Sequence, residues 1–219
     1  MLNFLPRLGR GVSGALALIM SLPLAACDTA FDTFELPTGT ADTYLQITAT
    51  GAGPLDQATA YGAKPIAAKL PGYTTDSLLI GLERLTATAV VVFRDANGGR
   101  AQVLHVVPGA SGGIGEIHGV SRHVIGPANE RPGMTLREAR VDPKSCRPGE
   151  GLWLGLAVCR SSGAANVALT FSFKGEPPAT PTLPDAATLA EGELQRIIWT
   201  PPPTPTLTPT PAVAKAPTP

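Results

Sequence analysis

Charged, aromatic and cysteine residues are all scarce in this chain of 219 residues, and the shortage of charge limits the classes of partner that the protein can bind. Charged residues make up 16% of the sequence, and the 17 basic side chains equal the 17 acidic ones. A nucleic-acid binder needs a concentrated basic patch, so we expect no nucleic-acid partner. No apolar run after residue 26 approaches the roughly 20 residues of a membrane-spanning helix. At 43% hydrophobic residues, the chain is still too apolar to be wholly disordered.

The common catalytic motifs are missing as well. The glycine-rich run 109–115 has neither the Lys-Ser/Thr ending of a P-loop nor the spacing of a dinucleotide-binding turn, so it predicts a tight turn or flexible loop. Ser111 lies outside any G-x-S-x-G elbow, and no H-E-x-x-H pair occurs. The acidic residues are scattered, which gives no paired carboxylates. We therefore expect a protein that is not an enzyme and needs no cofactor.

The N-terminus has the pattern of an export signal. Arg7 and Arg10 precede an apolar stretch over 11–26, which is typical of a secretory signal peptide. The stretch ends in Leu24-Ala25-Ala26-Cys27, which resembles the lipobox of bacterial lipoproteins. The resemblance covers the first 27 residues. It implies that residues 1–26 are removed and that the Cys27 thiol carries a diacylglycerol, with acyl chains such as palmitate holding the protein on a bilayer.

The same resemblance implies a location in the bacterial cell envelope, facing the periplasm. Asp28 resembles the signal that keeps lipoproteins of enteric bacteria in the inner membrane, but the inner and outer membranes both stay open. Without Arg7 and Arg10 the mature chain has 15 basic and 17 acidic residues, which disfavours an electrostatic grip on anionic lipid. The alternative is an ordinary signal peptide with a chance cysteine near its cleavage site.

The other two cysteines predict a disulfide. In an oxidising compartment an even pair such as Cys146 and Cys159 is typical of a disulfide, which closes a short loop here. A metal or redox pair is the alternative, but there is no C-x-x-C motif and no nearby histidine.

All three histidines, His105, His118 and His123, fall in one part of the sequence. Their grouping suggests a metal site as an alternative hypothesis. The spacing of His118 and His123 opposes it, because residues five apart on one strand point to opposite faces. A bulge at Gly119 would be needed to bring them together.

The body has the pattern of a β protein. Asn97-Gly98 predicts a hairpin in which Asp95 faces Arg100, Val92 faces Val103 and Val90 faces His105. Further strands are expected at 44–50, 152–158 and 167–173, and a brief helix within 56–68. We predict an antiparallel β-sandwich or barrel-like domain over 43–175, joined to the lipidated cysteine by a tether over 27–42.

The composition changes after residue 175. A Pro-rich linker is expected over 176–186, followed by a short amphipathic helix over 187–199 with a capping box at Thr188 and Glu191. Residues 200–219 hold eight Pro and six Thr and predict a disordered, extended tail. A short helix is marginal alone, so its apolar side chains are expected to dock on the body or on a partner. They are Leu194, Ile197, Ile198 and Trp199.

These features favour a lipid-anchored structural or assembly component that docks an envelope protein through the β body and the C-terminal segment, with cell-wall contact by the tail as a further possibility. One alternative is a lipoprotein that binds a glycan or small molecule, although the chain has only two Trp and three Tyr for such a face. A basic rim at 131–147 near Trp153 would suit an anionic ligand, or it is simply a solvated strand and loop. The second alternative is a metalloprotein or enzyme that uses the three histidines.

Overall fold

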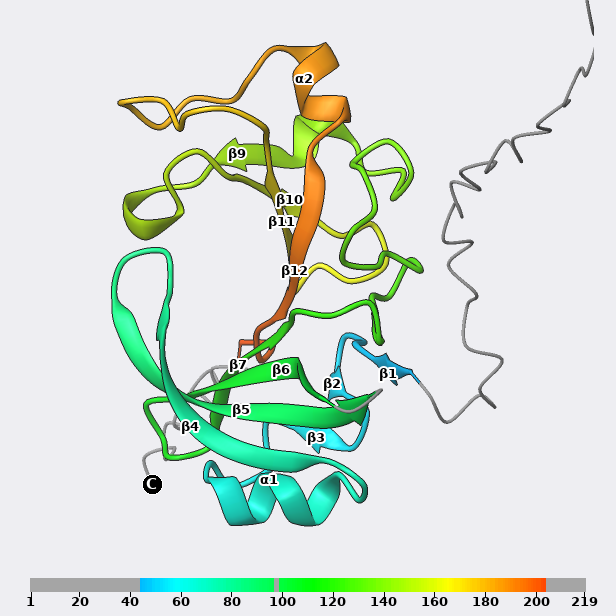
Figure 1. The fold of residues 1–219 in the computed structure, drawn as a ribbon, viewed down its shortest axis with the longest axis vertical. Coiled ribbons are helices and arrows are strands. Elements are labelled where there is room, and N and C mark those ends of the chain that lie inside the picture. The colour runs from blue at the N-terminus through cyan, green and yellow to red at the C-terminus, as the bar shows by residue number, and fades with distance from the viewer. Residues whose placement is uncertain (1–43, 97–98, 204–219) are drawn as a thin grey trace, which may run out of the picture. The chain divides into compact units, whose positions relative to one another are not determined.

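A computed structural model describes residues 44–96 and 99–203, and its main feature is an eight-stranded antiparallel sheet (Figure 1). The strand order is β4-β5-β6-β7-β12-β11-β10-β9. The bounds of these strands are β4 Thr74–Gly81, β5 Thr86–Ala96, β6 Gly99–Pro108, β7 Ile114–Gly119, β9 Cys146–Pro148, β10 Ala157–Arg160, β11 Val167–Ser172 and β12 Glu193–Trp199. The predicted all-β fold is confirmed.

Short elements surround this sheet. Two small sheets pair β1 with β8 and β2 with β3. The bounds of the remaining elements are β1 Leu45–Gln46, β2 Gly51–Ala52, β3 Leu55–Asp56, α1 Ala63–Lys69, β8 Val124–Ile125, α2 Ala186–Ala190 and the 3-10 helices η2 Pro143–Ser145 and η3 Gly151–Trp153. No helix among the described residues is long and apolar enough to cross a membrane.

The predicted hairpin is present as β5 and β6, with a change of register along its length. Asp95 faces Arg100 as expected. Val92 instead faces Leu104, and Val90 faces Val106. The register shifts by one because β6 carries an extra residue, Val103, between the partners of Phe93 and Val92. The turn residues 97 and 98 lie outside the described residues.

The predicted helix over 187–199 is wrong for most of its length. Only α2 is helical, and it begins at an Asp185 cap that accepts hydrogen bonds from the N–H groups of Ala187 and Thr188, not at the predicted capping box. Glu191 and Gly192 separate α2 from strand β12. β12 lies between β7 and β11 in the middle of the sheet, so tertiary pairing overrides the helical spacing of its apolar residues.

This strand also corrects the domain boundary and the docking prediction. The body continues to Trp199, and the predicted linker over 176–186 is instead a loop within the body that ends where α2 begins at Ala186. The four residues predicted to dock a partner are buried in the sheet, with exposed fractions of 4% or less: Leu194, Ile197, Ile198 and Trp199.

The region after the disulfide also differs from its prediction. Residues 152–158 do not form one strand, because η3 occupies the start and Gly155 has a φ of +85° that an extended strand does not allow. Only β10, from Ala157, is extended. The predicted strand at 167–173 is confirmed as β11, with Val167, Leu169 and Phe171 buried.

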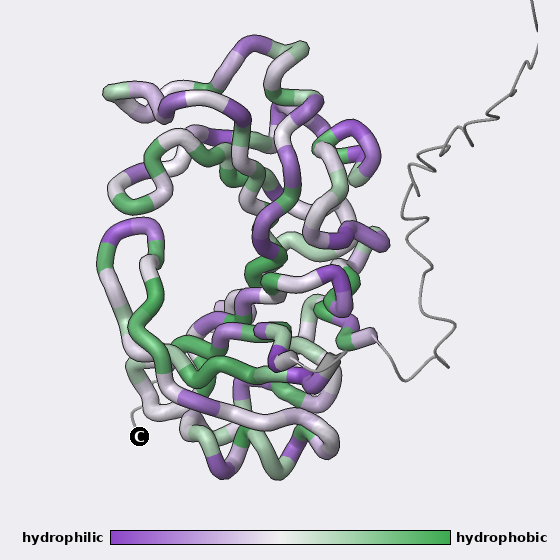
Figure 2. The backbone as a smooth tube through the Cα atoms, viewed as in Figure 1, coloured by the Kyte–Doolittle hydropathy of each residue, from purple (hydrophilic) through white to green (hydrophobic). Residues whose placement is uncertain are grey.

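The two faces of the sheet pack differently. One face carries the main core, to which β1, β8 and the helix α1 contribute buried side chains. Hydrophobic stretches of the central strands can be followed along the backbone in Figure 2. The Trp199 indole is fully buried there, and its Nε1–H donates to the Ala49 carbonyl at 3.0 Å. The opposite face carries a smaller cluster of Trp153, Val158 and Ile198 together with a polar network.

The disulfide prediction is confirmed. Cys146 of β9 and Cys159 of β10 are direct partners in the ladder and form the disulfide at one end of the sheet. The signal peptide, Cys27, the tether to residue 42 and the tail over 204–219 lie outside the described residues.

Candidate functional site

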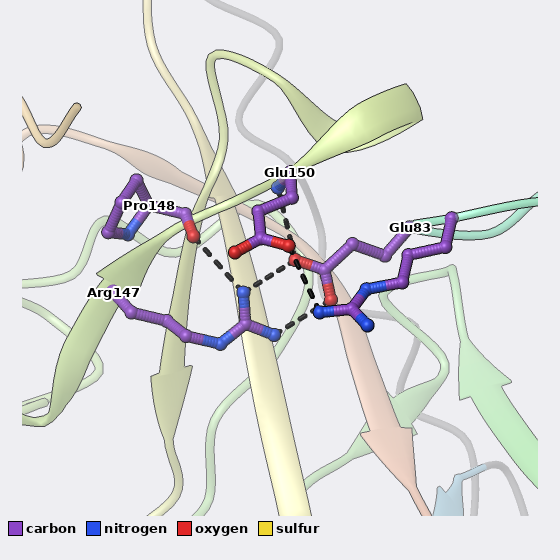
Figure 3. Close-up of polar contacts among 5 residues, drawn as sticks. Glu83, Arg147, Pro148 and Glu150 are labelled. Carbon is purple, nitrogen blue, oxygen red and sulfur yellow. Dashed lines mark hydrogen bonds and ion pairs between the residues drawn. The ribbon is translucent and has the colours of Figure 1, made fainter. Parts of the chain in front are cut away.

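A cluster of charged side chains joins the two ends of the eight-stranded sheet (Figure 3). Glu83 lies in the turn between β4 and β5, and both of its carboxylate oxygens accept hydrogen bonds from the guanidinium of Arg147 on β9. Arg84 binds Glu150 at 3.1 Å beside them. We call these four residues the closure cluster, because they connect the strand at one end of the sheet with the strand at the other.

Two backbone N–H groups also donate hydrogen bonds to Glu83 and fix its position in the closure cluster. The Leu152 N–H donates to the Glu83 carbonyl at 2.9 Å, and the Glu150 N–H donates to the Glu83 carboxylate at 3.1 Å. The Glu83 side chain is 18% exposed, whereas that of Arg84 is 78% exposed. The hydrogen bonds from Arg147 lower the pKa of Glu83 below its ordinary value, so the carboxylate stays ionised at neutral pH.

Exposed hydrophobic side chains gather near this closure. Leu85 follows Glu83 in the same turn and is 55% exposed, and Leu152 of η3 is 58% exposed. The other two large hydrophobic side chains that are exposed, among the residues whose burial is described, are Leu78 and Leu79 of β4. All four leucines come from β4, the β4–β5 turn and η3. Exposed hydrophobic side chains are usually scattered singly over a protein surface, so this grouping is unusual.

A polar network lies on the sheet face opposite the main core. His118 is fully buried, and its Nε2–H donates to the Glu116 carboxylate at 2.7 Å. Nδ1 of the same ring can then accept from the Arg196 guanidinium at 3.4 Å. Burial lowers the pKa of His118, so this ring is neutral and links Arg196 to Glu116.

His105 lies beside His118 as its direct cross-strand partner. Its Nε2–H donates to the side-chain amide oxygen Oε1 of Gln102 at 2.7 Å, and its Nδ1 is buried without a hydrogen-bond partner among the described residues. Burial, with smaller contributions from Arg196 and His118, lowers the pKa of His105 to about 4. Two of the three histidines therefore meet, as neutral rings within a packed face.

The third histidine lies elsewhere. His123 follows β7 and contacts Arg94 at 3.4 Å, and its carbonyl accepts from the Leu45 N–H. Within 44–96 and 99–203, no three His, Cys, Asp or Glu side chains form a group that could hold a metal ion. The bulge at Gly119 that a three-histidine site requires is not present, because β7 pairs in register through Gly119.

The basic stretch over 131–147 consists mainly of structural contacts. Arg137 pairs with Glu191, and Arg147 belongs to the closure cluster. Arg131 lies over the ring of Tyr44, 5.0 Å from its centroid. Trp153 is only 9% exposed and packs edge-on against the His118 ring, which removes it from any sugar-stacking surface. The solvated-loop interpretation therefore fits this stretch better than a recognition rim.

The glycine-rich run is the turn between β6 and β7. The Gly109 N–H donates to the Gly113 carbonyl at 2.8 Å, and Gly112 has a φ of +82°. A Cβ on Gly115 would lie 2.7 Å from the Pro108 carbonyl oxygen, so the two backbones approach closely only because this residue is glycine. The predicted tight turn is confirmed.

A hollow of about 340 Å³ lies between residues 154–156, which follow η3, and the proline-rich segment 177–184. Its lining includes the apolar residues Leu156, Phe173 and Leu183 and the charged residues Lys174 and Glu176. This volume is at the lower end of the range for small-molecule sites.

Sequence reasoning missed the closure cluster, and little in the sequence could have shown it. Glu83 and Arg147 lie 64 positions apart, and no motif connects them. The pair of Glu116 and His118 was accessible in principle, because residues two apart on a strand share a face.

Comparisons with known proteins inform the fold. No protein-family model matches the chain, and no curated protein matches it. The crystal structure of the uncharacterized protein yfeY from Escherichia coli is similar to this chain, with a TM-score of 0.53 at 19% sequence identity. The similarity covers 72% of this chain and 99% of that one, so the described body has a fold that is also found in an experimental structure.

Proposed function

We propose that this chain is a lipid-anchored protein of the bacterial cell envelope, without catalytic activity, whose β body docks another envelope protein beside the closure cluster. Leu85 and Leu152 form the docking surface. The observation that carries the proposal is that these two exposed leucines come from segments that meet at the closure, where the Leu152 N–H binds the Glu83 carbonyl.

The closure gives this surface the rigidity that a docking site needs. The turn is held to β9 by the two hydrogen bonds from Arg147 to Glu83 and to η3 by a backbone bond. The disulfide holds β9 to β10 next to it. A partner that covers Leu85 and Leu152 therefore loses little conformational entropy in ordering them.

The reach of the anchor favours a protein as the occupant over the bilayer itself. Tyr44 lies seventeen positions after Cys27, and a fully extended chain of that length spans at most about 60 Å. The body can thus stand well away from the membrane to meet a protein. The mild acidity of the mature chain also disfavours adsorption to anionic lipid.

The anchor and the docking surface are tested separately. Radiolabelled palmitate should enter the wild-type protein and not a Cys27→Ser variant, and a wild-type protein that stays unlabelled would refute the anchor.

A photo-crosslinking amino acid at position 85 or 152 should capture one protein of defined mass in living cells. The same amino acid at Lys64, on the outer side of α1, should capture nothing. Equal capture from all three positions would refute the docking surface.

The hollow beside Lys174 favours a second candidate function, the binding of a small amphipathic anion. Its apolar wall would cover the ligand's hydrocarbon part while the Lys174 ammonium meets the charge. Calorimetry with a short-chain fatty acid tests this function. Binding that is lost in Lys174→Met but kept in Lys144→Met would support it, and absence of binding to the wild type would refute it.

A further inference from the structure

We propose that β4 is a self-association edge, which pairs antiparallel with β4 of a second copy of this chain about a two-fold axis at Leu79. The proposal concerns the edge residues Leu78 and Leu79 and not the docking surface at Leu85 and Leu152. It does not depend on the lipid anchor.

β4 is open to a partner strand along most of its length. It is the terminal strand of the eight-stranded sheet, and β5 is the strand that pairs with it among the described residues (Figure 1). Four consecutive residues in its middle, 76–79, are exposed. Contacts from α1 reach the start of the strand, where the Thr75 hydroxyl donates to the Ala63 carbonyl.

The strand lacks the features by which edge strands usually avoid pairing. Its sequence, TTDSLLIG, contains no Lys and no Pro, and Asp76 is its one charged residue. Its eight pairs with β5 continue without a bulge. Leu79 is 71% exposed and Leu78 is 38% exposed, so both faces of this edge present apolar side chains. An edge of this kind is a template for another strand.

A second copy is the occupant that the sequence of β4 fits best. Opposite residues in an antiparallel pair share a face, so a two-fold axis must relate residues of the same parity. With Leu79 on the axis, it faces its own copy, and Leu78 faces Ile80 of the other copy. Ser77 then faces Gly81, and three consecutive apolar pairs form at the centre.

The charges also suit this register. Asp76 faces Leu82 of the other copy, so the two Asp76 carboxylates lie on opposite sides of the axis. They are six positions apart along the strands, or about 20 Å at 3.3 Å per residue. No like charges are opposed, and the joined sheets bury the edges of both copies.

Cysteine cross-linking in the full-length protein tests the register. With a short thiol-specific cross-linker, Leu79→Cys should give a band of twice the monomer mass on a non-reducing gel. Ser77→Cys is the matched control, because Ser77 is exposed on the same strand but lies four residues, or about 13 Å, from its own copy in this register. The wild type controls for a reactive Cys27. Equal dimer yields from positions 77 and 79, no dimer from either, or a cross-link to a different protein would each overturn the proposal.

The mass of the purified full-length protein in detergent gives a second measurement. Light scattering should show a dimer for the wild type and for Leu85→Lys. Leu79→Lys should weaken the dimer at least tenfold, because it opposes two ammonium groups on the axis. A monomeric wild type, or equal dissociation of both lysine variants, would overturn the proposal.

Discussion

Glu83 and Arg147 hold together the two ends of one sheet, although β4 and β9 are at opposite ends of the strand order. The contact involves both oxygens of one carboxylate and both terminal nitrogens of one guanidinium. Such a paired geometry is stronger and more directional than a single ion pair. The position of the β4–β5 turn, and with it the docking surface at Leu85 and Leu152, therefore depends on this contact.

Glu83→Gln should destabilise the fold by about 1–2 kcal/mol. It removes a charge that is mostly buried and leaves Arg147 without its carboxylate. The control is Glu150→Gln, which removes the exposed pair with Arg84 and a smaller electrostatic attraction to Arg147, and should cost less than about 0.5 kcal/mol. Urea unfolding at pH 7 measures both variants. Equal losses would show that Glu83 contributes no more than an ordinary surface charge.

Local signals in the sequence predicted the local parts of the fold. The pairing of Asp95 with Arg100 in the β5–β6 hairpin, the alternation in β11 and the pair of Cys146 and Cys159 each depend on residues close together in the chain, and each is confirmed in the structure. The register beyond Phe93 was not predictable, because no turn residue marks the extra Val103.

Residues 193–199 show why non-local parts of the fold, such as strand β12, were not predicted from the sequence. A central strand has both faces covered, and Ile197, Ile198 and Trp199 are buried in succession. This run hides the alternation of a strand and leaves a spacing that also fits a helix. The choice is made by β7 and β11, whose pairing with β12 is non-local, and single-sequence patterns do not contain that information.

The stability of the protein should fall as the pH drops from about 6.5 towards 4. The pKa of His105 is lowered from 6.5 to about 4 in the folded state, so in this range the unfolded chain binds a proton that the folded chain does not. Above pH 6.5 the ring is neutral in both states and has no effect. His118 adds to the same dependence, because burial lowers its pKa too, while Glu116 and Arg196 are the charged groups beside it.

His105→Gln should therefore flatten this dependence without removing it. The loss of stability due to His105 is on the order of 3–3.5 kcal/mol at most across the range, at 1.36 kcal/mol per pKa unit. Urea unfolding at pH 7.5, 6 and 5 gives the slope. His123→Gln, at a half-buried ring on another part of the surface, should leave most of the slope in place. If the stability of His105→Gln depends on pH as steeply as that of the wild type, the His105 ring of the wild type is protonated in the folded state and the prediction is wrong.

Loss of the disulfide should destabilise the end of the sheet. Cys146 and Cys159 are 13 positions apart, and closing a loop of this length contributes about 3 kcal/mol through the unfolded chain. The double variant Cys146→Ser/Cys159→Ser should lose about that much free energy of unfolding. We expect β9 to detach in this variant, so adding Arg147→Met to it should lower the stability little further. Additive losses would mean that β9 stays in place without the disulfide. Thermal unfolding with and without reductant measures both effects.

Gly119→Ala should be among the most damaging single methyl additions in the body. A Cβ at this position would lie 2.5 Å from Cγ1 of Val124 and 3.0 Å from Cδ1 of Ile47, both in the main core. Overpacking of this kind costs about 1–3 kcal/mol, because β7 is held between β6 and β12 and cannot shift alone. Gly81→Ala is the control, since its nearest neighbour would be Cδ1 of Leu152 at 3.6 Å, an ordinary contact. We expect the control to change the free energy of unfolding by less than about 0.5 kcal/mol. Equal tolerance of both alanines in chemical denaturation would mean that β8 can move away from β7, which would contradict the tight packing of Val124 and Ile47 on that strand.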